Sequence, residues 1–141
     1  MSGVSASAAS ACFLAFDFGT LRVGVACGSS LLRQAQRLHT IAASGDARWA
    51  AIGTLIHEWQ PQALVVGVPF HPDGAVHENT VRARRFARQL HGRFHLPVHE
   101  VDERWSTTEA LSQGARDVDA AAAAIILNQF FTQAELSHVA A

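Results

Sequence analysis

The run Ala63–Val68 constrains the fold more than any other stretch of this chain. It is apolar without interruption and is followed by Pro69, so it predicts a strand with both faces buried. A strand of that kind needs a layer of helices on each side of its sheet. The sequence therefore predicts an α/β domain with this strand near its centre.

Helical patterns flank this run. We expect one helix to begin at Asp46, which can act as its N-cap, and to end before Pro61. The spacing predicts a second helix over Asn79–Phe94, with Val81 among the residues available for the core. A third helix is expected after Asp119, where five alanines favour helix and allow close packing on the sheet.

Other stretches predict the remaining strands. Phe13–Cys27 predicts two antiparallel strands joined by a tight connection, and Leu31–Thr40 a third, less regular one. Pro97–Val101 predicts the fifth, followed by a helix starting near Ser106 or Thr107. This order is that of the ribonuclease H-like fold, a five-stranded mixed sheet with helices on both faces. Its sheet combines a three-stranded antiparallel meander with two parallel strands.

The length of 141 residues fits one domain. We expect a flexible N-terminal tail over 1–12, the ribonuclease H-like domain over 13–132, and a C-terminal tail over 133–141. No apolar run approaches the roughly 20 residues of a membrane-spanning helix. The first twelve residues lack the basic leader and apolar centre of a signal peptide. These features predict a cytoplasmic protein without a membrane partner, in which Cys12 and Cys27 are free thiols.

The charge pattern leaves two interpretations open. A formal net charge of −1 gives no global indication of nucleic-acid binding, yet all eleven basic residues are Arg. Five of them crowd the second predicted helix: Arg82, Arg84, Arg85, Arg88 and Arg93. Arginine binds phosphate well because its guanidinium donates two parallel hydrogen bonds. The cluster is either a solvated helix face or a face directed at phosphate groups.

Acidic residues far apart in the sequence fall at one predicted rim of the sheet. They are Asp17, the pair Asp102 and Glu103, and Asp119. Each has an ordinary alternative, as a turn residue, as a partner of Arg104, or as a helix N-cap. Carboxylates packed together repel unless a cation neutralises them, and their hard oxygens suit Mg²⁺ or Mn²⁺. Two such ions can activate a water and stabilise the leaving oxygen of a phosphodiester.

An ordered set of motifs resembles the YqgF (RuvX) family, over about Phe13 to Phe131. The segments are Phe16–Ala26, Val65–Pro69 with Asp73 and Gly74 downstream, Arg82–Ala87, Asp102–Thr107 and Asp119–Leu127. Members of that family are described as ribonuclease H-like nucleases. They are proposed to process the 5′ end of precursor 16S ribosomal RNA, and also proposed to resolve Holliday junctions.

The resemblance implies roles for particular residues. Asp17, Glu103 and Asp119 correspond to the family's catalytic acids, which would hold Mg²⁺ or Mn²⁺, with Asp102 as the alternative to Glu103. Arg22 corresponds to a basic position expected to bind phosphate. Further candidates for substrate binding are Arg104, Thr20, Ser106, Thr107 and Arg85. Two departures from the family are a short stretch between Thr108 and Asp119, and Trp105 where an aliphatic residue is common.

Four functions follow as hypotheses. The first is a metal-dependent endonuclease acting on structured RNA, and the second a resolvase of branched DNA, which needs two sites in two-fold symmetry. A monomer and a homodimer therefore both remain open. The third is a weakly catalytic binding module in ribosome maturation. The fourth is suggested by the likeness of the residues around Asp17 to the phosphate loop of actin-like and sugar kinases, but one domain cannot close two lobes around ATP.

Overall fold

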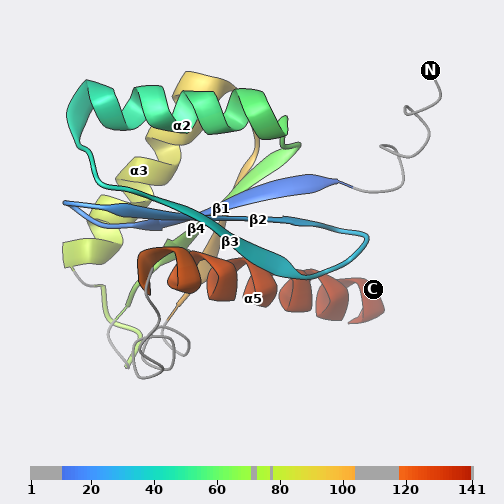
Figure 1. The fold of residues 1–141 in the computed structure, drawn as a ribbon. Helices are drawn as coiled ribbons and strands as arrows, with labels where there is room; N and C mark the ends of the chain where they lie inside the picture. Colours follow the sequence, from blue (N-terminus) through green and yellow to red (C-terminus); the bar gives the residue numbers. More distant parts are fainter. Residues whose placement is uncertain (1–10, 71–72, 77, 104–117, 141) are drawn as a thin grey trace, which may run out of the picture.

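The computed structural model describes residues 11–70, 73–76, 78–103 and 118–140. They form one sheet between two helical layers, with α2 and α3 on one face and α5 on the other (Figure 1). The strands are β1 (Cys12–Phe18), β2 (Val23–Ser29), β3 (Ala35–Ile41), β4 (Ala63–Val68) and β5 (Val98–Asp102). The helices are α2 (Gly45–Trp59), α3 (Glu78–Phe94) and α5 (Val118–Ala140).

The strand order is β3-β2-β1-β4-β5. β1 pairs antiparallel with β2, and β2 antiparallel with β3, which is the predicted meander. β4 pairs parallel with β1, and β5 parallel with β4. The ribonuclease H-like sheet expected from the order of elements is therefore confirmed, and β4 is buried along its whole length.

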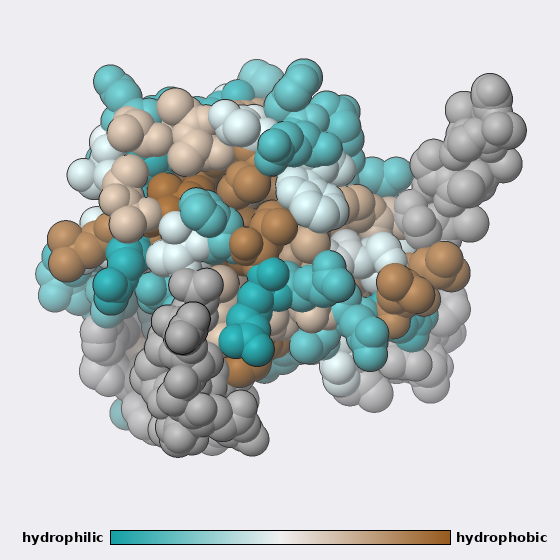
Figure 2. Space-filling model, viewed as in Figure 1, coloured by the Kyte–Doolittle hydropathy of each residue, from teal (hydrophilic) through white to brown (hydrophobic). Residues whose placement is uncertain are grey.

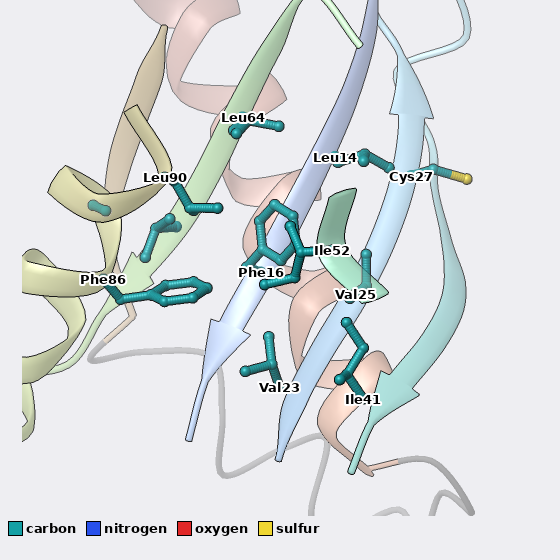
Figure 3. Close-up of a cluster of buried hydrophobic side chains, with 12 residues drawn as sticks. Leu14, Phe16, Val23, Val25, Cys27, Ile41, Ile52, Leu64, Phe86 and Leu90 are labelled. Atoms are coloured by element: carbon teal, nitrogen blue, oxygen red, sulfur yellow. The ribbon is translucent and has the colours of Figure 1, made fainter. Parts of the chain in front are cut away.

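The sheet face under α2 and α3 carries the larger core. Side chains of β1, β2 and β4 point to this face and meet Ile52 of α2 and Phe86 and Leu90 of α3 (Figure 3). The rings of Phe16 and Phe86 make an edge contact with centroids 6.0 Å apart. Because successive strand residues point to opposite faces, Asp17 points away from this core.

The opposite face carries small residues, so that α5 lies close to the sheet. Gly24 and Gly28 of β2 both contact α5 at the position where a side chain would begin. Ala15 and Val65 pack there against Ile126 and other apolar residues of the helix. The alanine run after Asp119 thus packs as expected, with its backbone near the strands.

Several predicted boundaries were wrong. β3 begins at Ala35, because the chain turns before it: the Arg33 amide donates to the Ser29 carbonyl, and Arg33 has φ 52°. Leu31 and Leu32 lie in that connection and are 68% and 72% exposed. Figure 2 shows hydrophobic surface at this end of the meander.

The helix ends differ from the predictions in smaller ways. α2 has Ser44 as its N-cap, and Asp46 lies in the first turn, where its charge favours the helix N-terminus. Val81 is 57% exposed and does not join the core. α5 begins at Val118, so Asp119 lies inside its first turn, and the helix continues to Ala140 beyond the expected start of the tail. The division into one domain and two tails stays a prediction.

Cys12 and Cys27 are both free, as predicted. Within the described residues, no helix is long and apolar enough to cross a membrane.

Candidate functional site

Three carboxylates approach one another on the α5 face, where β1 and β5 end. Asp17 is the penultimate residue of β1, and Asp119 lies in the first turn of α5. Glu103 directly follows β5, and its amide donates a 3.2 Å hydrogen bond to the Val68 carbonyl, which extends the parallel ladder by one bond. The first strand, the last strand and the last helix of the described chain therefore each supply one acid.

Gly24 allows the helix to reach Asp17. It is the direct partner of Asp17 in the β1–β2 register, and a Cβ at this position would collide with the Asp119 carbonyl. Glycine within a strand commonly marks such a close approach of another backbone. The contact places the first turn of α5, and with it Asp119, beside the carboxylate of Asp17.

Glu103 also lies close to a glycine of a neighbouring strand, Gly67 of β4. A Cβ at Gly67 would collide with the Ile126 side chain and would lie 2.6 Å from Glu103 Oε2, so the carboxylate and Ile126 share the space above this glycine. Glu103 Oε2 is buried and has no hydrogen-bond partner in the part of the chain that the structure describes. A buried, unsatisfied carboxylate oxygen is costly, and a bound cation is one way to satisfy it.

Burial and mutual repulsion raise the pKa values of Asp17 and Glu103, which we call the inner acids. Desolvation, with a contribution from the negative charge of Asp119, raises the pKa of Asp17 to about 7. Desolvation, followed by the charges of Asp17 and Asp102, raises the pKa of Glu103 to about 8. Perturbed carboxyls of this kind are typical of functional sites.

Asp119 differs from the two inner acids because it has a counter-ion. Arg22 Nε lies 3.2 Å from Asp119 Oδ2, and both side chains are partly exposed. The guanidinium of Arg22 is thereby held at the rim of the acidic cluster.

The backbone of Asp102 is hydrogen-bonded to α5. Its carbonyl accepts a 3.1 Å hydrogen bond from Gln129 Nε2 of α5. The carboxylate of its neighbour Glu103 lies beside Gly67.

The carboxylates suit a hard divalent cation, but among the described residues they do not form a complete metal-binding site. All the carboxylates are oxygen ligands of the class that Mg²⁺ and Mn²⁺ prefer. Among the described residues, no group of three or more His, Cys, Asp or Glu side chains is arranged to hold one metal ion. Carboxylates without a neutralising cation repel one another, and Asp119 is engaged with Arg22.

The other predicted site residues separate into two groups. Thr20 and Arg85 line a hollow on the α2 and α3 face. Arg104, Ser106 and Thr107 lie outside the described residues.

The arginine cluster of α3 also divides. Arg84 pairs with Glu100 at 3.4 Å, and the Arg93 guanidinium stacks 4.3 Å from the Trp49 ring centroid. Arg82 and Arg85 instead face the hollow that holds Thr20. Only part of the cluster therefore faces a concave surface.

Arg48, Gly24 and Gly67 were not predicted from the sequence. Arg48 is 6% exposed and lines the same hollow as Arg85. A signal was present, because Arg48 precedes the buried Ile52 by four residues and so shares its helix face. Gly24 and Gly67 interrupt strands of β-branched residues, which is a sequence sign of close approach.

Comparison with known proteins agrees with this architecture. The chain is similar to two relatives named "Putative pre-16S rRNA nuclease". The relative from Albidiferax ferrireducens is 70% identical over 118 residues, covering 84% of this chain and 76% of the relative. The relative from Polaromonas sp. is 67% identical over 118 residues, covering 84% of this chain and 86% of the relative.

Among solved structures, Thermus thermophilus RuvC in complex with a Holliday junction substrate has a TM-score of 0.55. The match has 18% sequence identity and covers 89% of this chain and 96% of that chain. At this identity the likeness concerns the fold alone. The model of the RuvX family, described as Holliday junction resolvase, matches residues 11–133. The chain therefore belongs to the RuvX (YqgF) family.

Proposed function

We propose that this protein is a metal-dependent endonuclease that hydrolyses phosphodiester bonds of structured RNA, and that its substrate is the 5′ end of precursor 16S ribosomal RNA. The observation that carries the proposal is the meeting of Asp17, Glu103 and Asp119, with Glu103 Oε2 buried and without a hydrogen-bond partner among the described residues. The names of the relatives support the choice of RNA. We place the protein in the cytoplasm, where that substrate is made.

Asp17 and Glu103 are the residues proposed to hold Mg²⁺ or Mn²⁺, with Asp119 beside Asp17 as a further ligand. A divalent cation bound there supplies activation of the attacking water and stabilises charge on the phosphate. Because Asp17 and Glu103 have raised pKa values, they release protons when the cation binds near neutral pH. Arg22, held by Asp119, presents N–H donors to the phosphate that is attacked.

The decisive test is cleavage of precursor 16S rRNA by the wild type and by Asp17→Asn, with Mg²⁺ or Mn²⁺. We expect the substitution to abolish cleavage while the protein remains folded, because a neutral amide lacks the negative charge that attracts a divalent cation to the site. Asp46→Asn is the matched control, since Asp46 is an exposed carboxylate in the first turn of α2. Equal activity of the wild type and Asp17→Asn would contradict the proposal and indicate a contaminating nuclease.

A second candidate is the resolution of branched DNA, favoured by the description of the family model. The same acids would act, but opposed strands require two copies of the site related by two-fold symmetry. A four-way DNA junction assayed beside the RNA distinguishes the two. Paired cuts in the junction by a dimer would favour the second candidate, and a strictly monomeric protein on junctions would exclude it.

A third outcome is a binding module with little turnover. Mg²⁺ bound to the folded protein should raise its melting temperature through linkage. Absence of that rise, together with RNA binding without cleavage, would favour the binding module over both nuclease hypotheses.

A further inference from the structure

A hollow of about 300 Å³ lies on the opposite face of the sheet from the carboxylates. It is lined by Phe18, Thr20, Arg48, Arg82, Arg85 and Gln89, and we call it the arginine hollow. Phe18 follows Asp17 directly in β1, and successive strand residues point to opposite faces. The hollow and the acidic site therefore lie on the two sides of the same strand end.

Arg48 places a buried positive charge at this hollow. Its Nε donates to the Ala43 carbonyl at 2.8 Å, and its Nη2 donates to the Thr20 carbonyl at 3.1 Å. The guanidinium carbon lies 5.7 Å from the Phe18 ring centroid. The side chain is thus fixed by two carbonyls and an aromatic face.

No carboxylate among the described residues forms an ion pair with Arg48. A guanidinium remains protonated in proteins, so it cannot escape this environment by losing its charge. A buried charge without a counter-ion is unfavourable unless something of opposite sign binds nearby. The arrangement favours an anionic ligand.

Side chains of α3 supply further hydrogen-bond donors to the arginine hollow. Arg82, Arg85 and Gln89 are three and four residues apart along α3 and so share one helix face. Arg82 pairs with the exposed Glu78 at 2.7 Å. Arg85 has no ion-pair partner in the described part of the chain. The three guanidinium groups outnumber the one acid beside them, so the hollow has an excess of positive charge.

We propose that the arginine hollow binds a phosphate group of the nucleic-acid substrate other than the one that is hydrolysed. The proposal rests on the nuclease function proposed above. Guanidinium groups match phosphate oxygens through paired hydrogen bonds, and Gln89 and Thr20 supply further polar atoms. A strand crossing the end of β1 would place one phosphate over the carboxylates and another over the hollow. The second contact would fix where along the substrate the acids act.

The first test measures binding without cleavage. Wild type and Arg85→Ala are titrated against a fluorescent RNA in EDTA over a range of salt concentrations. We expect Arg85→Ala to weaken binding about tenfold at low salt, and to lower the slope of log affinity against log salt by about 1. Binding in EDTA does not depend on turnover, so failure of the proposed nuclease function would leave this result intact.

Arg88→Ala is the matched control. Arg88 lies three residues further along the same helix and lines a different hollow, with His91, Pro97 and Glu100. We expect its affinity for the RNA to change less than about twofold. Equal losses from the two substitutions would overturn the proposal, because they would indicate diffuse attraction by the whole helix.

The second test uses wild-type protein and inorganic phosphate, so it does not depend on the folding of a variant. The Nε–H of Arg48 is buried and hydrogen-bonded, and its NMR signal should resist exchange with water. We expect saturable shifts of the Arg48 and Arg85 signals, with the Arg93 signal as the internal reference. No saturable shift up to tens of millimolar phosphate would overturn the proposal.

The source of the phosphate is distinguished by one RNA prepared with a 5′-phosphate and with a 5′-hydroxyl. Tighter binding of the phosphorylated form, lost in Arg85→Ala, would support recognition of a terminal phosphate. Equal binding of the two forms, weakened equally by Arg85→Ala, would support recognition of an internal phosphate.

Discussion

The two sides of the β1 end hold buried charge of opposite sign and respond to it differently. On the α5 side, burial and repulsion raise the pKa of Asp17 and Glu103, so these acids can become neutral by binding protons. On the α2 and α3 side, burial lowers the pKa of Arg48, but a guanidinium stays charged throughout the accessible range of pH. The acidic side can therefore be neutralised by protons or a metal, whereas the basic side requires an anion.

The largest expected effect is a fall in the rate of cleavage that leaves the affinity for RNA unchanged. Glu103→Gln should reduce the rate of cleavage about 10²–10³-fold, because the buried carboxylate is a proposed metal ligand and metal catalysis supplies several kcal/mol. Affinity for the RNA in EDTA should stay within about twofold, since the arginine hollow is unchanged. Glu58→Gln, at an exposed position of α2, serves as the control in both assays. Parallel loss of affinity and rate would mean that the two sides do not act separately.

The next effect tests the backbone contact that places Asp119. Gly24→Ala should lower the free energy of unfolding by about 2–3 kcal/mol, because the new Cβ collides with the Asp119 carbonyl and α5 must shift. Urea unfolding measures the change, and cleavage should fall with it, while phosphate binding at the hollow should persist in the folded fraction.

Gly92→Ala is the matched control for that substitution. A Cβ at Gly92, within α3, would meet nothing within 4 Å, so alanine there should stabilise the protein by up to about 1 kcal/mol. Destabilisation by both substitutions would contradict the assignment of the Gly24 effect to the α5 contact.

The smallest expected effect is the change in the free energy of unfolding with pH. Asp17 and Glu103 have higher pKa values in the folded protein than their ordinary values of 3.8 and 4.5. The folded state therefore binds more protons, and the free energy of unfolding of the metal-free protein should fall by about 1–3 kcal/mol as pH rises from about 4 to about 8. Stability at each pH is measured by urea unfolding in EDTA.

Asp17→Asn should reduce this loss of stability, and saturating Mg²⁺ should shift it to lower pH. Binding of RNA at the arginine hollow should not follow the same profile, since guanidinium groups keep their charge over this range. A profile of stability that is identical in the wild type and Asp17→Asn would show that Asp17 is not the residue that titrates.

The sequence predicted the sheet well because its signals are local or topological. The apolar run Ala63–Val68 requires cover on both faces, and the order of elements then leaves few arrangements. The meeting of Asp17 with Asp119 was also predictable from that order, because both lie at the same end of the sheet.

What the sequence did not predict depends on contacts between distant elements. The sequence predicts Glu103 as the acid after β5, with Asp102 as the alternative, but the contact of the Glu103 carboxylate with Gly67 of β4 is visible only in the folded structure. The position of Arg48 at a concave surface likewise depends on hydrogen bonds from its guanidinium to the carbonyls of Ala43 and Thr20.

Asp119 is also the last of the three acids to be synthesised, because α5 follows β1 and β5 in the chain. The acids of β1 and β5 leave the ribosome before the helix that carries Asp119, and α5 packs across the whole meander. An unfinished chain consequently lacks one of the three acids, whichever strands have already paired. Under the proposed function, hydrolysis therefore requires α5 to pack on the sheet and bring Asp119 beside Asp17.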